Sequence, residues 1–584
     1  MTAAQYVQGQ GASGNAVPSG VASDCEGSTP GSPFIPVDSW IYPAVWRLYS
    51  LGFLDNVYLG VRPWTRASLS HMLEDTENNL EDADPGSLTD EAQKLYDAVT
   101  RELDRDSDAT CLRAEARVES TYSATQAISG TPLHDSFHLG STVVNDYGRP
   151  FENGLNNYSG ASGYARYGRY TLYLRGEFQG APSAAGYSPS LNQALAIVDL
   201  TTNPVTGLAY NNQATIPLGP ISTTTQGRFL EAYVSTQILN HVISFGKMDE
   251  WLGPAEGGSF AYSNNAENIY AFHINRIEPL QIPVLSQITG PFRYEFLVGE
   301  LRGHTLMPNP LYTSGSTTQP NVISPGDPWV HVEKISFKPT ANLEFGFERT
   351  AMFGGEGHSP VTLHTFLKSF FSTSATSPAV KDSRYDPGAR FGAFDFSYRL
   401  PFLRNWATLY ADGEVHDDLS PIDAPRRASW RPGIYLVRVP GVPKLDFRLE
   451  ASSTDPVSSP PGGQFMYWET IERQGYTNQG QIFGDWMGRE DKGGQAWMTY
   501  HLSGNEWIQL TARTQKAAKD FIPGGTTLND IGVEVEKRIH RDFAISGSFT
   551  AEHWKAPVYL PGEQTATTTR FQVTWYPRQK YDLR

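Results

Sequence analysis

An alternation of apolar and polar residues recurs from Cys111 nearly to the C-terminus, and it constrains the fold more than any other feature. In the first segment, residues 112, 114, 116 and 118 are apolar, and residues 113, 115, 117 and 119 are Arg or Glu. Six later segments repeat this period of two, at 170–178, 293–298, 394–399, 445–450, 543–550 and 571–575. Side chains alternate between the two faces of a β-strand, so the pattern predicts many strands with one apolar and one polar face.

Two β-architectures fit such strands. In a soluble sandwich the apolar faces point inward and the charged residues meet bulk water. In a transmembrane barrel the apolar faces point outward, and mid-strand Arg, Glu and Asp pair across strands around a wet lumen. The alternation leaves both open. The number of strands, without a signal for a second β-domain, favours one closed barrel because closure removes the edge strands.

Composition agrees with a barrel but is also compatible with a large secreted β-protein. Charged residues make up 18% of the 584 residues, against about 25% in an ordinary soluble domain. Aromatic residues reach 12%, as expected where girdles of Tyr, Trp and Phe lie at both membrane interfaces. Mean hydropathy is −0.39, and no apolar run approaches the roughly 20 residues of a membrane helix.

Charge and the first residues bear on partners and location. The net charge is −16 and no basic patch stands out, so nucleic acid is not expected as a partner. The opening MTAAQYVQGQGASGNAVPSG has neither the basic nor the apolar segment of a secretory signal. The chain is therefore either cytoplasmic or has lost a signal, and the barrel pattern favours a signal that has been removed.

The N-terminal part divides into an arm and a helical segment. Residues 1–36 are rich in Gly, Ser, Ala and Pro and predict an extended or mobile arm. Residues 37–110 then show helical spacing, and residues 111–584 form the predicted barrel. In the first helix Asp38 is the expected N-cap, and Gly52 stands where a helix ends.

Two more helices complete this segment. Thr65 is the expected N-cap of the second, which Asp84-Pro85-Gly86 ends, and Thr89 is the expected N-cap of the third. Each helix carries an apolar stripe, so the three should pack as a small bundle on one another or on the barrel.

Four long stretches rich in Gly, Pro, Ser, Thr and Asn interrupt the strands, at Gly180–Pro220, Met307–Asp327, Phe371–Arg384 and Ser452–Gly463. Transmembrane barrels have short turns on one side of the membrane and long loops on the outer side. These stretches are therefore predicted as outer loops.

The two cysteines, Cys25 and Cys111, bracket the helical segment. A disulfide between them would close a loop of roughly 85 residues and stabilise the fold by about 4 to 5 kcal/mol in the loop-entropy model. It would need an oxidising compartment such as the periplasm. The alternative is two buried free thiols.

Seven segments in order along the chain resemble the Wzi capsule-assembly family of outer-membrane proteins. They are PVDSWIYPAVWRLYSLGFL with RPWTRASLSHML, WLGPAEGGSFAYSNNA, NLEFGFERTAMFGGEGHSP, ADGEVHDD, WRPGIYLVRVPG, GDWMGREDKGGQAWMTYHLS and FIPGGTTLND. The resemblance implies a periplasmic α-helical bundle and a transmembrane antiparallel β-barrel of about 18 strands in the outer membrane. It also implies a lectin-like protein that binds capsular or related exopolysaccharide. Outer-membrane lipids are a further expected partner, and envelope export or assembly proteins are possible ones.

The sequence does not predict an enzyme, a cofactor or a metal site. It lacks GxSxG, HExxH and P-loop motifs, and the spacing of His358 and His364 is wrong for a helical metal pair. Asp417 and Asp418 fit a solvated turn better than a cation site. Glycoside hydrolysis needs two carboxylates at a set separation, which the sequence positions of Glu469, Glu472 and Glu490 do not establish.

Sugar binding needs aromatic faces for stacking and planar polar groups for hydrogen bonds. Two short segments combine both and supply the predicted polysaccharide-binding residues, namely Trp251, Asn264, Asn265, Asp485, Trp486, Arg489 and Glu490. The alternative is structural: Trp486 could belong to a girdle, and Asn264 and Asn265 could pack inside the barrel.

Two other functions fit the same barrel. A substrate-specific porin or polysaccharide export channel would have a continuous aqueous path, whereas a polysaccharide-binding protein would have an obstructed lumen. A scaffold in an envelope complex would co-purify with partner proteins. Conductance and co-purification therefore distinguish the three.

Overall fold

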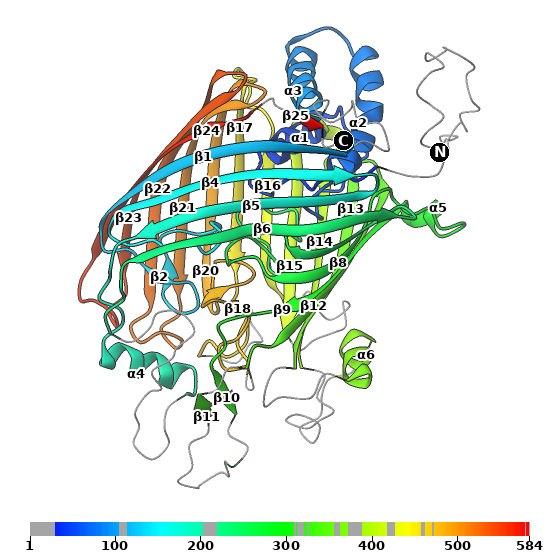
Figure 1. Ribbon diagram of the computed structural model, residues 1–584. Helices are drawn as coiled ribbons and strands as arrows, with labels where there is room; N and C mark the ends of the chain where they lie inside the picture. Colours follow the sequence, from blue (N-terminus) through cyan, green and yellow to red (C-terminus); the bar gives the residue numbers. More distant parts are fainter. Residues whose placement is uncertain are drawn as a thin grey trace.

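The computed structural model describes residues 30–103, 114–201, 219–308, 311, 321–323, 326–354, 362–371, 388–416, 427–456, 462–469, 472–577 and 580–582. A helical segment comes first and a barrel follows (Figure 1). The helices are α1 (Ile41–Leu51), α2 (Arg66–Glu81), α3 (Ser87–Leu103), α4 (Pro189–Val198), α5 (Ser286–Thr289), α6 (Leu363–Phe371) and the 3-10 helix η2 (Pro401–Leu403). The strands are β1 (Ala114–Gly130), β2 (His134–Asp135), β3 (Gly140–Ser141), β4 (Gly154–Tyr167), β5 (Tyr170–Ala181), β6 (Thr224–Ile238), β7 (His241–Lys247), β8 (Tyr270–Arg276), β9 (Phe292–Glu300), β10 (Leu306–Pro308), β11 (Asn321–Ile323), β12 (Trp329–Thr340), β13 (Leu343–Phe353), β14 (Ala389–Arg399), β15 (Ala407–His416), β16 (Ser429–Leu436), β17 (Leu445–Ser453), β18 (Thr477–Asn478), β19 (Gln481–Ile482), β20 (Asp491–Ser503), β21 (Glu506–Ala517), β22 (Thr526–His540), β23 (Phe543–Lys555), β24 (Gln564–Trp575) and β25 (Lys580–Asp582).

One sheet closes on itself to form the barrel. Among the described residues it has nineteen strands, and β25 is a three-residue segment that continues β24 along β1. The remaining eighteen strands each pair antiparallel with the next along the chain, and β1 closes the ring against β24, with Tyr122 opposite Thr574. The prediction of a closed barrel of about 18 strands is confirmed.

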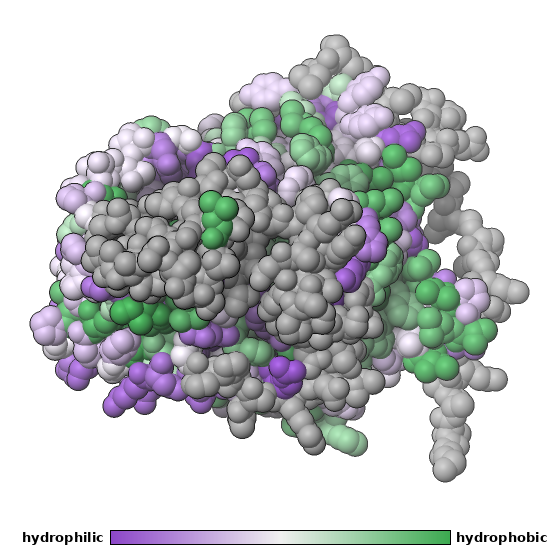
Figure 2. Space-filling model, turned by 90° about the horizontal axis from the view of Figure 1, so that it is seen from below, coloured by the Kyte–Doolittle hydropathy of each residue, from purple (hydrophilic) through white to green (hydrophobic). Residues whose placement is uncertain are grey.

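The wall of the barrel has its apolar face outside. On β5, Leu172 and Phe178 are exposed by 41% and 58%, whereas Arg175 and Glu177 between them are buried. Green apolar residues accordingly lie on the flanks of the barrel in the end-on view (Figure 2). This orientation excludes the soluble sandwich and gives a membrane-spanning barrel with a polar inner face. No helix of the described chain is long and apolar enough to cross a membrane.

The two ends of the barrel differ in the length of their connections. At the end next to the helical segment, five connections are two-residue turns, at 168–169, 239–240, 341–342, 504–505 and 541–542, and three are longer, at 277–291, 400–406 and 437–444. The described parts of the predicted outer loops, which include α4, β10 and the end of α6 at Phe371, lie at the opposite end (Figure 1). The rest of these loops lies outside the described residues. Helix α4 within Gly180–Pro220 was not predicted.

The helical segment contains the three predicted helices, but not all of the predicted caps. Thr65 accepts a hydrogen bond from the amide of Ser68, and Gly52 ends α1 at a φ of 94°. Two caps are wrong. Asp38 does not cap α1, because its carboxylate binds Arg175 of β5 instead. Thr89 lies inside α3, which begins at Ser87.

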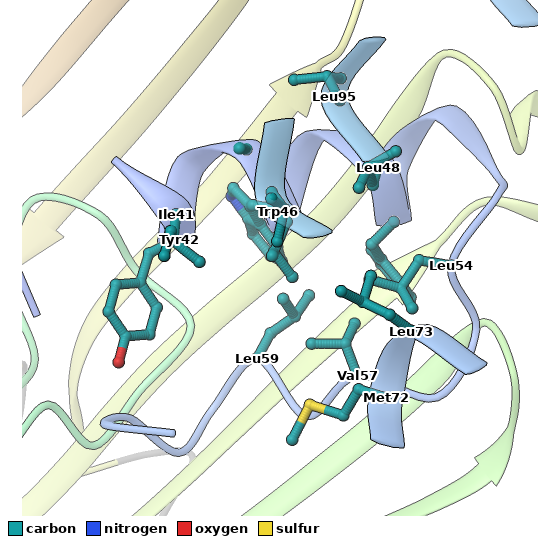
Figure 3. Packing of buried hydrophobic residues seen from close by; sticks show 14 of the residues in the cluster. Ile41, Tyr42, Trp46, Leu48, Leu54, Val57, Leu59, Met72, Leu73 and Leu95 are labelled. Atoms are coloured by element: carbon teal, nitrogen blue, oxygen red, sulfur yellow. The ribbon is translucent and has the colours of Figure 1, made fainter. Parts of the chain in front are cut away.

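The helices pack on one another and on the barrel wall through one apolar cluster (Figure 3). Trp46 of α1 lies at its centre, with its ring 5.5 Å from that of Tyr410 on β15 and stacked 6.2 Å from that of Tyr435 on β16. Residues 30–36 pack on the rest of the chain, since Phe34 and Ile35 are buried and Phe34 forms a β-bridge with Thr65. Of the two predicted forms of the arm, these residues take the extended one, and its bounds stay a prediction.

Several predictions concern residues outside those described. These are the disulfide between Cys25 and Cys111 and the positions of His358, Asp417 and Asp418. The predicted boundary between residues 110 and 111 also lies there, since α3 ends at Leu103 and β1 begins at Ala114. The boundary and the disulfide stay predictions.

Candidate functional site

Three loop segments fold back into the barrel and pack together; we call them the lumenal plug. They comprise residues 131–149 after β1, 248–269 between β7 and β8, and the described residues of 462–490 between β17 and β20. Backbone hydrogen bonds join them, from the amide of Tyr147 to the carbonyl of Asn264 (2.7 Å) and from that of Ser263 to the carbonyl of Phe483 (3.2 Å).

Aromatic side chains form the centre of the plug. The rings of Tyr262 and Phe483 lie 4.0 Å apart, and Phe137 from the first segment is fully buried in the same cluster. The hydroxyl groups of Tyr467 and Tyr476 donate to the backbone carbonyls of Phe260 and Ala261. Each buried phenol therefore has a partner, as a rigid polar-and-apolar core requires.

The first group of predicted sugar-binding residues belongs to this plug. Trp251 is 5% exposed, its indole N–H donates to the carbonyl of Ala255 and the guanidinium of Arg62 lies 5.4 Å from its ring. Asn265 donates to the carbonyl of Ile482 and accepts from the amide of Asn145. Asn264 is also buried. Asn264 and Asn265 thus pack inside the barrel, as the structural alternative predicted.

The second group is buried still more deeply. Asp485 binds Arg431 of β16 through both carboxylate oxygens, at 2.6 and 2.7 Å. The ring of Trp486 is 0% exposed, with the guanidinium groups of Arg431 and Arg513 at 5.3 and 5.1 Å from its centre. Trp486 is therefore not a girdle residue, and neither face of its ring is open to a sugar in this conformation. Direct sugar contact stays an untested prediction.

Arg489 and Glu490 tie the third segment to its neighbours. Arg489 donates to Asp199 beyond α4 at 2.5 Å and to the carbonyl of Gly463, and its guanidinium lies 4.4 Å from the ring centre of Phe137. Glu490 accepts from the amide of Gly463. The structure thus brings all seven predicted residues into one buried body, where they hold loops to one another and to the wall.

Sequence reasoning missed the wall residues that anchor the plug. Besides Arg431, Glu450 of β17 accepts from the amides of Glu256 and Gly257, and Gln515 of β21 donates to the carbonyl of Met487. The alternation at 445–450 assigned Glu450 to a polar strand face, but Arg431 and Gln515 lie outside the alternating segments. No local signal in the sequence identified the loop that each one binds.

His138 also escaped prediction, and it links the plug to α4. Its Nδ1 lies 2.9 Å from Asp135, and its Nε2 lies 2.8 Å from Asp199. Burial lowers the pKa of His138, but the charges of the two carboxylates outweigh it and raise that pKa to about 9. His138 is therefore an imidazolium that joins two carboxylates at neutral pH.

We expect this link to weaken at alkaline pH. Because the pKa of His138 rises on folding, its stabilisation is fully present below pH 6.5 and is lost as the pH passes about 9. The substitution His138→Gln should therefore cost about 3 kcal/mol more at pH 6 than at pH 10. Thermal unfolding of both proteins in detergent at the two pH values measures this difference. An equal cost at both would show that His138 is neutral in the folded protein.

A polar cavity of about 430 Å³ remains in the lumen beside the helical segment. Trp40 and Trp507 line it together with charged groups that include Asp38, Arg149 and Arg175. Burial raises the pKa of Asp38, but pairing with Arg175 at 2.6 Å and the nearby charge of Arg149 bring it below its usual value. The volume of the cavity falls in the range of small-ligand sites. Its lining of tryptophan rings and charged groups suits a polar ligand with flat apolar faces.

The carboxylates considered for hydrolysis do not gather at this cavity. Glu469 lies 3.5 Å from His416, Glu472 lies 4.0 Å from His304, and Glu490 holds the amide of Gly463. None of the three lines the cavity. Each instead has a separate partner in or beside the plug.

Comparisons with known proteins agree with this architecture. The family model for capsule assembly protein Wzi matches residues 123–569. The chain is similar in structure to the Escherichia coli protein described as Wzi, an outer membrane protein involved in group 1 capsule assembly and a carbohydrate-binding β-barrel. The TM-score is 0.61 at 16% identity, covering 93% of this chain and 99% of that one.

A relative in Klebsiella pneumoniae, described as an uncharacterized 55.8 kDa protein in the cps region, is 24% identical over 263 residues. The matched part covers 43% of this chain and 45% of the relative, so the chain spans less than half the length of that protein. The structural likeness confirms the fold, and the family match covers most of the barrel.

Proposed function

Because the chain belongs to the Wzi capsule assembly family, we propose that it is a lectin-like protein that binds and organises capsular or related exopolysaccharide at the cell surface. The barrel lies in the outer membrane, where its apolar outer face meets lipid. The observation that carries the proposal is the plug, because buried loops joined by hydrogen bonds fill the lumen of a barrel that would otherwise be wide. Such a protein holds a polymer at its rim more readily than it conducts one.

The long loops at the end opposite the helical segment are the proposed binding face. In this proposal the seven predicted sugar-binding residues act mainly indirectly. They lie in the lumenal plug and hold the loops in position from inside the barrel. Arg489 shows how, because it joins the third plug segment to Asp199 at the C-terminal end of α4. The role is binding without catalysis, and the helical end is the proposed contact for envelope export or assembly proteins.

The decisive test is binding of acidic polysaccharide from the host by the purified barrel in detergent, with conductance in planar bilayers measured on the same preparation. We expect retained polysaccharide and no stable single-channel current. Failure to bind any capsular or exopolysaccharide of its own host would refute the function and leave the fold intact. A steady current would instead favour the porin or export channel.

Substitution of the buried tryptophan tests the role of the plug in binding. Trp486→Ala should weaken polysaccharide binding about tenfold, equivalent to 1.4 kcal/mol, because it leaves a cavity beneath the loops. Trp575→Ala is the matched control, since that ring is 41% exposed on the outer wall. Equal affinity of the two variants would remove Trp486 from the binding machinery.

A further inference from the structure

Three buried side chains converge on one point where the plug meets the barrel wall. Glu250 belongs to the second plug segment, His273 to β8 and Glu295 to β9. Their ligand atoms all lie within 4.8 Å of one another. Nδ1 of His273 is 3.5 Å from Oε2 of Glu250 and 3.8 Å from Oε1 of Glu295. None of the three side chains is more than 3% exposed.

Three polar atoms of this cluster lack hydrogen-bond partners within the described chain. The two carboxylate oxygens of Glu250 have no hydrogen bond there, and Nδ1 of His273 has none either. Glu295 is different, because its Oε2 accepts from Asn275 at 2.9 Å and its Oε1 is left facing His273. A buried carboxylate without a partner is costly, so such a group normally holds a cation, a proton or a donor.

The described protein cations near the cluster form no ion pair with it. Arg293 of β9 donates one hydrogen bond, to the side-chain oxygen of Asn275, and its charge acts on Glu295 from beyond ion-pair distance. Lys334 of β12 binds Asp395 at 2.7 Å and lies 3.6 Å from Glu348. Among the described residues, no Lys or Arg nitrogen lies within ion-pair distance of Glu250. Within the described chain, two carboxylates and an imidazole therefore share a pocket in which no Lys or Arg forms an ion pair with them.

The distances suit a small divalent cation. Zinc binds His nitrogen and carboxylate oxygen at about 2.0 to 2.2 Å, which places two ligands of a tetrahedral ion about 3.4 Å apart. The two measured separations from Nδ1 are 3.5 and 3.8 Å. An imidazole among the ligands favours Zn²⁺ over Ca²⁺ or Mg²⁺, which prefer oxygen. Asn275 would orient Glu295, as outer partners of metal ligands commonly do.

We propose that Glu250, His273 and Glu295 form a binding site for a divalent transition-metal ion, best matched by Zn²⁺. The ion fastens the second plug segment to the wall at β8 and β9. Glu250 precedes Trp251, whose backbone pairs with that of Arg62 in the helical segment. The site therefore lies where plug, wall and helical segment meet, and it stabilises the closed lumen.

The test is metal content after refolding, because the buried ligands have to be loaded as the protein folds. Tag-free protein is refolded from urea into detergent with equimolar Zn²⁺, dialysed against EDTA and analysed by inductively coupled plasma mass spectrometry. We expect about one zinc per chain in the wild type and less than about a tenth in His273→Gln and Glu250→Gln. X-ray absorption should give a nitrogen and oxygen shell at about 2.0 to 2.2 Å.

His138→Gln is the matched control. It also removes a buried histidine between two carboxylates, but both of its ring nitrogens are already paired. This variant should keep its zinc even where its stability falls. A wild type without zinc would overturn the proposal and leave a proton shared by Glu250 and Glu295. Zinc retained by both His273→Gln and Glu250→Gln would overturn it by placing the ion elsewhere.

Discussion

Replacing Arg431 by methionine should destabilise the plug by about 3 to 5 kcal/mol, the usual cost of breaking a buried ion pair from one side. Arg431 is fully buried and binds Asp485 through two hydrogen bonds and Glu450 through a third at 3.1 Å. Without the guanidinium, Asp485 and Glu450 stay buried with less compensation. Hydrogen exchange should then be about a hundredfold to a few thousandfold faster in the plug, since 1.4 kcal/mol corresponds to a factor of ten.

Two further variants make this prediction specific. Arg431→Met combined with Asp485→Asn should recover part of the loss, because the second change removes one of the two stranded charges. Lys492→Met is the control. Lys492 also forms an ion pair, with Asp455, but its side chain is 63% exposed. Such surface pairs contribute about 0 to 1 kcal/mol. If both single variants exchanged at the same rate, Arg431 would not anchor the plug.

Truncating Trp46 to alanine should release the helical segment from the barrel at a cost of about 3 to 5 kcal/mol, as for other buried tryptophans. The ring of Trp46 packs on Tyr410 and Tyr435 of the wall, with the guanidinium of Arg448 5.2 Å from its centre. Limited proteolysis should cut α1–α3 from the variant while the barrel stays intact.

Phe402→Ala provides the comparison at the same end of the barrel. Phe402 lies in a turn between β14 and β15 and is 100% exposed. Its truncation should leave both the unfolding midpoint and the cleavage pattern unchanged. Similar cleavage of the Trp46→Ala and Phe402→Ala variants would show that other contacts, such as those of Arg47 with Glu91 and Asp446, hold the helices in place.

The wall could be predicted from sequence because its information is local. Side chains two residues apart share a face, so Leu172 and Arg175 were assigned to opposite sides before any partner was known. The cap at Thr65 was equally local, since its acceptor and donor are three residues apart. Asp38 was misassigned because Arg175, its actual partner, lies 137 residues away in the chain.

The plug could not be predicted for the same reason. Its segments carry no periodicity, and their partners lie on strands or loops far along the chain, as with Asp485 and Arg431, which are 54 residues apart. WMGRE was therefore compatible with a girdle, a sugar-binding turn or a buried loop. The closed barrel distinguishes these three alternatives, because it creates an interior in which Trp486 is buried.

The plug also sets an order of events in folding. Its three segments are attached to β1, β7 and β17, and the hydrogen bond between Ile482 and Ser136 joins residues 346 positions apart. Closing so long a loop costs chain entropy that only later contacts repay, and such distant contacts slow folding. We therefore expect strand pairing to precede the packing of the plug, so that pulsed hydrogen exchange during refolding finds the wall protected before the plug.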